Sequence, residues 1–222
     1  MEKSHGQASY RYLKYIPEAY DPAGTTLVSL VVFLHGAGER GDDLELVKKH
    51  GIPKEAEAGR QFPFVAICPQ CERETRWDPA RVEGLVGAIE EEYRIDPDRI
   101  YLTGMSMGGM GTWATAMTYP ERFAALAPVC ARGDATDIAR ITHVPVWAFH
   151  GDADTVVPEE KGRAMVEALR AAGGVVGYTI YPGVGHDSWT ATYGDERLYA
   201  WLLANKRGAP PVAPPVSETE PE

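Results

Sequence analysis

Apolar residues follow two alternating patterns along this chain. Short runs that are apolar almost throughout, rich in β-branched and aromatic residues, stand at residues 27–34, 64–68, 99–102, 123–129, 144–149 and 175–181. Runs of this length without polar alternation are typical of strands buried on both faces of a parallel sheet. An aromatic and β-branched run at residues 10–16 predicts one further strand.

The stretches between these runs predict helices. Helical spacing places one apolar stripe on residues 79–93, formed by Val82, Leu85, Val86 and Ile89. Residues 107–119 are apolar on all sides, which is typical of a helix buried against a sheet, and Pro120 ends it. Shorter apolar sets indicate three more helices, at Leu44 and Val47, at Met165, Val166 and Leu169, and at Leu198, Trp201 and Leu202.

Strands that alternate with helices predict an α/β fold, with a mostly parallel central sheet and helices on both faces. We expect one catalytic domain over residues 1–208. Residues 209–222 hold five prolines, three glutamates and no aromatic residue, and predict a disordered tail. Only residues 130–143 separate two of the strands, so no substantial cap domain is expected. Functional groups in such sheets gather beyond the carboxyl ends of the strands.

Composition narrows the class of function. The 222 residues carry a formal charge of −10, which disfavours binding to nucleic acid or to anionic lipid. No apolar run is long enough to insert into a membrane. The first ten residues lack an apolar signal sequence, so a cytoplasmic protein is expected as the chain stands, or a secreted or periplasmic one if a signal peptide was removed. Cys68, Cys71 and Cys130 are too few for a disulfide framework and are expected as buried free thiols.

One motif carries a nucleophile. Gly104-Met105-Ser106-Met107-Gly108 stands between the strand at 99–102 and the helix at 107–119. G-x-S-x-G at a strand–helix junction is typical of the sharp turn that exposes a nucleophilic serine in α/β-hydrolases. The flanking glycines suit this turn because it leaves little space for side chains.

A nucleophilic serine needs a base, and the base needs an orienting acid. His186 follows the strand at 175–181 and is the candidate base. The loop after the strand at 144–149 offers two candidate acids, Asp152 and Asp154. His150 is expected to be structural. A metal hydrolase is the alternative, but no H-E-x-x-H or similar spacing supports it, so neither a metal nor another cofactor is expected.

An oxyanion hole completes the expected site. The N–H of Met107, directly after the serine, is one candidate donor, and the N–H of Ala37 in the glycine-rich loop 35–41 is the other. Trp77 and Trp189 are candidates for pocket walls, with ordinary loop packing as the alternative for each. Glu39 and Arg40 are expected to form a surface ion pair, with contact to substrate as the alternative, and His50 is expected to be solvated or to make local contacts.

The chain resembles the α/β-hydrolase superfamily, and within it the compact carboxylesterase and prolyl-oligopeptidase-related group. The resemblance rests on FLHGAGERGDD at 33–43, RIYLTGMSMGGMGTWA at 99–114, VPVWAFHGDADTVVP at 144–158 and GHDSW at 185–189. It implies a catalytic triad of Ser106, Asp154 and His186, with Ala37 and Met107 as oxyanion donors.

This resemblance implies a serine carboxylic-ester hydrolase that works through an acyl-enzyme. Because no cap is expected, small esters with short acyl chains are the expected substrates. A serine peptidase or amidase of small substrates is one alternative. A catalytically silent binding protein of the same fold is the other.

Overall fold

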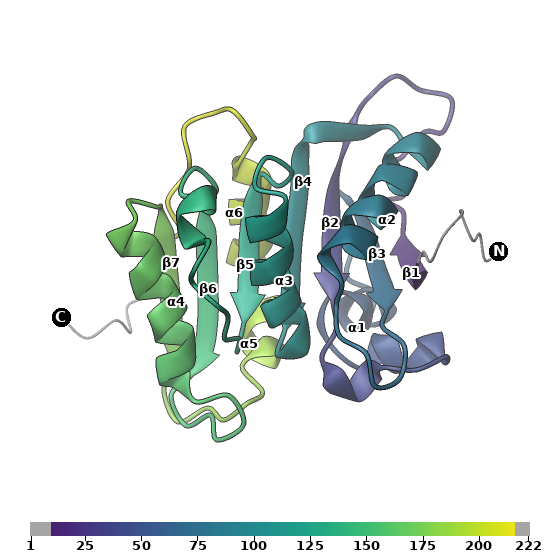
Figure 1. The fold of residues 1–222 in the computed structure, drawn as a ribbon. Coiled ribbons are helices and arrows are strands. Elements are labelled where there is room, and N and C mark those ends of the chain that lie inside the picture. Colours follow the sequence, from purple (N-terminus) through teal and green to yellow (C-terminus); the bar gives the residue numbers. More distant parts are fainter. Residues whose placement is uncertain (1–9, 216–222) are drawn as a thin grey trace.

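The computed structural model describes residues 10–215, whose strands form one twisted sheet (Figure 1). The strand order is β1 (Arg11–Tyr15), β3 (Val65–Gln70), β2 (Val28–Leu34), β4 (Ile95–Met105), β5 (Ala125–Val129), β6 (Val146–Gly151) and β7 (Val176–Tyr181). Neighbouring strands are parallel except for β1 and β3, which are antiparallel. The predicted α/β class with a mostly parallel sheet is confirmed.

Helices cover both faces of the sheet (Figure 1). One face carries α2 (Pro79–Glu92), α3 (Met107–Thr118) and α4 (Glu159–Ala171), and the other carries α1 (Gly51–Glu57), α5 (Trp189–Gly194) and α6 (Glu196–Ala204). Successive strand residues point to opposite faces. Leu30 and Val32 of β2 accordingly join the core under α2 and α3, whereas Val31 and Phe33 join the core under α1 and α6.

Short 3-10 helices complete the described elements: η1 (Ala37–Glu39), η2 (Leu44–Lys49) and η3 (Ile138–Ile141). The helix expected from Leu44 and Val47 is thus a 3-10 helix, and an α-helix begins only at Gly51. Helix α5 was not expected, because the sequence from Trp189 to Gly194 has no apolar spacing. Strand β3 runs two residues past its expected end, because Pro69 and Gln70 still pair with β1.

The C-terminal segment begins differently from the expected tail. The indole N–H of Trp201 donates to the carbonyl oxygen of Val212 at 2.9 Å, and the Val212 N–H donates to Asn205 Oδ1 at 2.9 Å. Pro214 is buried, and its ring lies against Gly177 of β7. The segment is therefore attached to the body of the molecule at Val212 and Pro214, and its other residues are exposed. The tail expected for residues 216–222, and residues 1–9 of the expected domain, lie outside the described residues.

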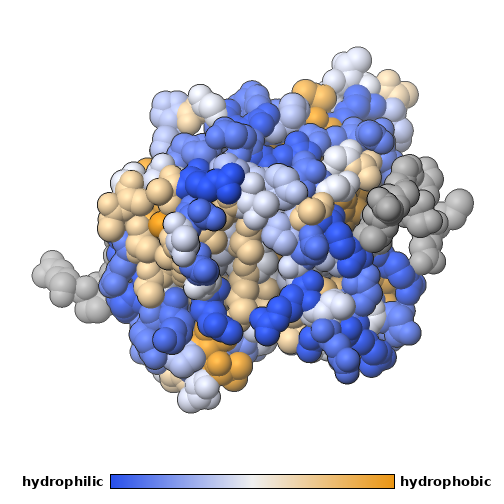
Figure 2. All heavy atoms as spheres, viewed as in Figure 1, coloured by the Kyte–Doolittle hydropathy of each residue, from blue (hydrophilic) through white to orange (hydrophobic). Residues whose placement is uncertain are grey.

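The surface is mostly hydrophilic and the three cysteines are buried, as the amino-acid composition suggests. Hydrophilic residues cover most of the face seen in Figure 2, and the more apolar ones form smaller patches. Within residues 10–215 no helix combines the length and the apolar character that crossing a membrane requires. Cys68, Cys71 and Cys130 are buried free thiols, as expected. Burial raises the pKa of Cys68 and of Cys130, which keeps both thiols protonated at neutral pH.

Candidate active site

Ser106 lies on the sharp turn between β4 and α3. Its backbone has φ 53° and ψ −115°, a conformation that non-glycine residues seldom adopt. The Ser106 N–H donates to the carbonyl oxygen of Val129 at 2.9 Å, which ties the turn to the end of β5. Strained backbone of this kind is held only where the surroundings determine it, and it is frequent at functional sites. Ser106 is partly exposed at the carboxyl edge of the sheet.

Two glycines make this turn sterically feasible. A Cβ atom on Gly108 would lie 1.8 Å from the carbonyl oxygen of Leu34 in β2. A Cβ atom on Gly104 would lie 2.5 Å from the carbonyl carbon and oxygen of Gly108. The contacts are with backbone, which has little freedom to shift. The G-x-S-x-G pattern is therefore a packing requirement of the β4–α3 junction.

His186 and Asp154 meet Ser106 from two other loops. His186 Nε2 lies 2.9 Å from Ser106 Oγ, and His186 Nδ1 lies 2.7 Å from Asp154 Oδ2. Asp154 follows β6 and His186 follows β7, so parallel strands deliver all three side chains to one edge of the sheet. The Asp154 side chain is fully buried, and the His186 side chain is 19% exposed. The three side chains form one hydrogen-bonded chain that opens to solvent at the serine.

Asp154 is held as a carboxylate. Burial raises its pKa, but the hydrogen bond from His186 and the backbone N–H donors of Val157 and Val156 outweigh burial, and the pKa of Asp154 is lowered from its ordinary value. Asp154 Oδ1 accepts from the two N–H groups at 2.9 Å and 2.8 Å. An ionised Asp154 orients the His186 ring so that Nδ1 carries the proton and Nε2 is free to accept one from Ser106.

The other polar residues of this loop make different contacts. Asp152 is exposed, and its Oδ1 accepts from the Gly183 N–H at 2.6 Å, away from His186. His150 is buried, with Nε2 2.8 Å from the carbonyl oxygen of Val157 and 3.3 Å from Asp154 Oδ2. His150 thus supports the loop as a structural residue, as expected.

The loop that carries Ala37 lies against the serine turn. Leu34 and His35 present their carbonyl oxygens to Gly108, and Gly36 lies beside Met105. Ala37 begins η1 and Met107 begins α3, and the first N–H groups of a helix have no partner within it. The N-terminus of α3 also favours negative charge. The N–H groups of Ala37 and Met107 thus both stand at helix starts next to the Ser106 turn.

His35 stabilises this loop from below. Its Nε2 accepts from the Cys71 N–H at 3.0 Å, which leaves the proton on Nδ1, 2.6 Å from the carbonyl oxygen of Gly36. That carbonyl belongs to the same peptide group as the Ala37 N–H. Burial lowers the pKa of His35 to about 4; the hydrogen bond to Gly36 opposes this shift, and the positive charge of Arg40 adds to it. His35 is neutral at physiological pH and orients the peptide that presents Ala37.

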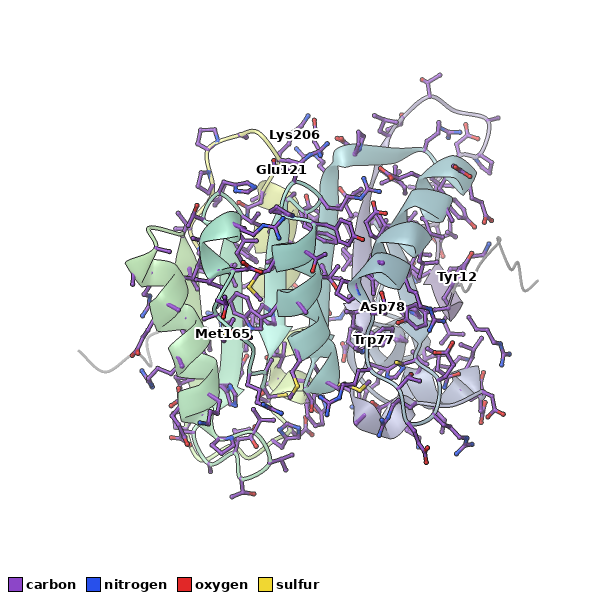
Figure 3. All side chains as sticks on the ribbon, in the orientation of Figure 1. Tyr12, Trp77, Asp78, Glu121, Met165 and Lys206 are labelled. Atoms are coloured by element: carbon purple, nitrogen blue, oxygen red, sulfur yellow. The ribbon has the colours of Figure 1, made fainter. Side chains whose placement is uncertain are left out.

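The two tryptophans have different environments. Trp77 is 6% exposed, its indole N–H donates to the carbonyl oxygen of His35 at 3.1 Å, and its ring packs against Tyr10 and Gly111. Figure 3 shows Trp77 with Asp78 at the start of α2. These contacts are those of loop packing, the alternative for Trp77. Trp189 is partly exposed, and its ring lies 5.2 Å from that of His186 and nearly perpendicular to it.

The expected surface ion pair of Glu39 and Arg40 is wrong. The Glu39 side chain is 8% exposed and faces His35 and His50, whereas Arg40 donates to the carbonyl oxygens of Ala37 and Thr75. Glu39 is buried, whereas Arg40 is only partly buried and donates to backbone. His50 was expected to be solvated or to make local contacts, and no sequence pattern pointed to its contact with Trp189. Within residues 10–215 no group of three or more His, Cys, Asp or Glu side chains is arranged to hold a metal ion.

Known proteins resemble this chain in sequence. The model of the phospholipase/carboxylesterase family matches residues 80–196. The chain is 25% identical over 206 residues to acyl-protein thioesterase 1 of Gibberella zeae, covering 75% of this chain and 87% of that protein. It is 33% identical over 100 residues to a putative carboxymethylenebutenolidase of Salmonella typhimurium, covering 41% of this chain and 37% of that one.

A solved structure extends the match. A thermostable esterase superposes with a TM-score of 0.76 and 34% identity, over 89% of this chain. The chain spans 59% of the length of that esterase. Catalytic triads and oxyanion holes are typical of this fold. The predicted superfamily and the predicted class of enzyme, a carboxylesterase-type hydrolase, are confirmed. The chain belongs to the phospholipase/carboxylesterase family of α/β-hydrolases and is a serine ester hydrolase.

Proposed function

We propose that this protein hydrolyses small, short-chain carboxylic esters, with Ser106 as nucleophile, His186 as base and Asp154 as the orienting acid. The observation that carries the proposal is the continuous hydrogen-bonded chain from Ser106 Oγ through His186 to Asp154. The lowered pKa of Asp154 supports its role, since an ionised carboxylate stabilises the imidazolium that forms during turnover.

The reaction follows from these positions. His186 Nε2 takes the proton of Ser106 Oγ as the oxygen attacks the ester carbonyl carbon. The carbonyl oxygen becomes an oxyanion, which the N–H groups of Ala37 and Met107 stabilise; one such donor contributes about 3–4 kcal/mol. His186 then gives its proton to the alcohol oxygen, and the C–O bond to the alcohol breaks. Water attacks the acyl-enzyme by the same sequence, which releases the acid and restores Ser106.

The open approach to Ser106 supports the preference for short acyl chains. The connection from β5 to β6 contains only η3 as a helix, and Gly133 in this connection packs against Met165 of α4. Figure 3 shows Met165 on the helical layer formed by α2, α3 and α4. A connection held on that face leaves no cap to desolvate a long acyl tail. The rim that remains includes Trp189, which we propose as a pocket wall.

The test is Ser106→Ala, assayed on p-nitrophenyl butyrate with fluorophosphonate labelling in parallel. We expect the wild-type protein to be labelled at Ser106, and the variant to lose labelling and about 10⁶-fold in kcat. Asp152→Asn, a change outside the hydrogen-bonded chain, serves as control and should keep both properties. Unchanged turnover by Ser106→Ala would refute the assignment. A labelled wild type that cleaves anilides faster than esters would indicate an amidase instead, and a protein that is neither labelled nor active would indicate a silent binding protein.

A further inference from the structure

Three side chains beside the proposed site form a series in which each contacts the next, although they come from separate segments of the chain. The indole N–H of Trp189, at the start of α5, donates to His50 Nδ1 at 3.3 Å. His50 Nε2, just before α1, lies 3.8 Å from Glu39 Oε1 in η1. At the other end of this series the Trp189 ring contacts the His186 ring, with ring centroids 5.2 Å apart and an interplanar angle of 88°. The series therefore connects the loop of Ala37 with the loop of His186.

The protonation of His50 follows from its partners. Because Nδ1 accepts the indole N–H, it carries no proton, and the proton of the neutral ring is on Nε2, which faces Glu39. Glu39 is nine-tenths buried, and its Oε2 has no hydrogen-bond partner among the described residues. The 3.8 Å between His50 Nε2 and Glu39 Oε1 is beyond hydrogen-bond distance, so the contact between the two side chains is electrostatic. The hydrogen bond from Trp189 sets the tautomer of His50, and Glu39 lies beside the Nε2–H of that tautomer.

The His186 loop needs such an anchor. His186 follows Gly183-Val184-Gly185, a segment with two glycines and correspondingly high backbone freedom. Asp152 holds the glycine side of this loop through the Gly183 N–H. On the other side, Trp189 is three residues beyond His186, and its hydrogen bond to His50 fixes the ring that packs against the imidazole.

We propose that Glu39, His50 and Trp189 form a positioning network that holds the His186 ring in line with Ser106. None of the three touches the reacting atoms, and the network acts through His186. The inference rests on the proposed function, because it assigns His186 as the base. It predicts an effect on kcat, whereas a role of Trp189 confined to walling the pocket predicts an effect on KM.

The test compares variants that break the network with one that preserves it. Trp189→Phe keeps a ring against His186 but removes the donor, and His50→Phe removes the acceptor while leaving Trp189 in place. We expect each to lower kcat for p-nitrophenyl acetate about 10-fold, with KM unchanged within about twofold, since small misplacements of catalytic groups are costly. The double variant should be no slower than either single one, because one network is lost only once.

A further variant tests for rescue of kcat, and another serves as a control. His50→Gln offers an amide oxygen to the indole N–H and should recover most of the lost kcat. Trp201→Phe removes the indole N–H that donates to the carbonyl oxygen of Val212, away from the site, and should retain wild-type kcat. The downfield NMR resonance of the His186 Nδ1 proton, bonded to Asp154, should broaden in Trp189→Phe and in His50→Phe and remain sharp in Trp201→Phe.

The proposal is overturned if Trp189→Phe and His50→Phe raise KM alone, if their effects multiply in the double variant, or if the His186 resonance is unchanged. A wild-type protein that hydrolyses no ester would refute the proposed function. The NMR comparison would still decide the network in that case, because it does not depend on turnover.

Discussion

Asp152 and Asp154 stand two residues apart in one loop but make different hydrogen bonds. Asp154 is buried and receives hydrogen bonds from His186 and from two backbone N–H groups, whereas Asp152 is exposed and receives one from Gly183. An asparagine in place of Asp152 keeps the acceptor oxygen. An asparagine in place of Asp154 loses the charge and turns an amide group toward either His186 or the backbone donors.

We therefore expect Asp154→Asn to lower kcat by about 10⁴-fold and Asp152→Asn to change it only slightly, on the precedent of the serine-protease triad. Steady-state kinetics on one ester, with far-ultraviolet circular dichroism to verify folding, measures both. The reverse ranking would assign the acid to Asp152.

The His35 side chain makes the stability of the folded protein depend on pH. Its pKa is about 4 in the folded protein because of burial, against 6.5 ordinarily. Between these values the unfolded chain binds more protons, so the free energy of unfolding rises with pH across this window and falls on acidification. The loss from pH 6.5 down to pH 4 amounts to about 3 kcal/mol for this one group.

Urea unfolding at pH 7.5 and pH 4.5 checks this expectation. The free energy of unfolding should fall between the two pH values, and the fall should be smaller in His35→Gln. Should that variant not fold, the titration of the His35 ring by NMR in the wild-type protein provides the same information. A His35 that titrates near pH 6.5 in the folded protein would contradict it.

At the scale of elements, the junction of β4 and α3 depends on the absence of side chains. The Cβ atom of an alanine at position 108 would overlap the backbone of Leu34, so β2 and α3 would have to separate. Gly84, by contrast, lies in α2 with no atom within 4 Å of an added Cβ atom. The two glycines therefore offer a matched pair of substitutions.

We expect Gly108→Ala to lower the free energy of unfolding by about 3 kcal/mol and to abolish ester hydrolysis. Gly84→Ala should raise it by about 0.5–1 kcal/mol, because alanine restricts the unfolded chain and favours helix. Chemical denaturation measures both changes. An active and stable Gly108→Ala protein would mean that the contact between the turn and β2 is looser than described.

At the scale of the whole molecule, the proposed open approach to Ser106 rests on the connection between β5 and β6. It packs against α4 and brings no cap over the carboxyl edge of the sheet. A buried methylene contributes about 0.8 kcal/mol, but only where an apolar wall removes it from water.

Acetyl to butyryl esters should consequently give the highest kcat/KM in a series of p-nitrophenyl esters from two to twelve carbons, with no increase in rate at a lipid–water interface. A higher kcat/KM on dodecanoyl than on butyryl esters would contradict the open site, and would leave the assignment of Ser106 unaffected.

The sequence alone determined the class of fold and the position of the proposed nucleophile. Apolar runs and helical spacing report on burial one element at a time, so they predicted the parallel strands and the helices 79–92 and 107–118 closely. The G-x-S-x-G pattern is local as well, because the contacts that require glycine at positions 104 and 108 lie within one turn and its neighbouring strand. The order of serine, acid and histidine followed from the order of the strands.

Tertiary structure decided everything that depends on which segments meet. Residues 150–154 contain two carboxylates that the strand pattern does not distinguish; the family resemblance favoured Asp154, and the hydrogen bond to His186 is a tertiary contact that Asp154 makes and Asp152 does not. Glu39 was expected at the surface, but its side chain is buried in the structure. Trp189 donates to His50, which is 139 residues away in sequence. Periodicity describes the face of an element that is buried, whereas hydrogen bonds between loops depend on the three-dimensional path of the chain.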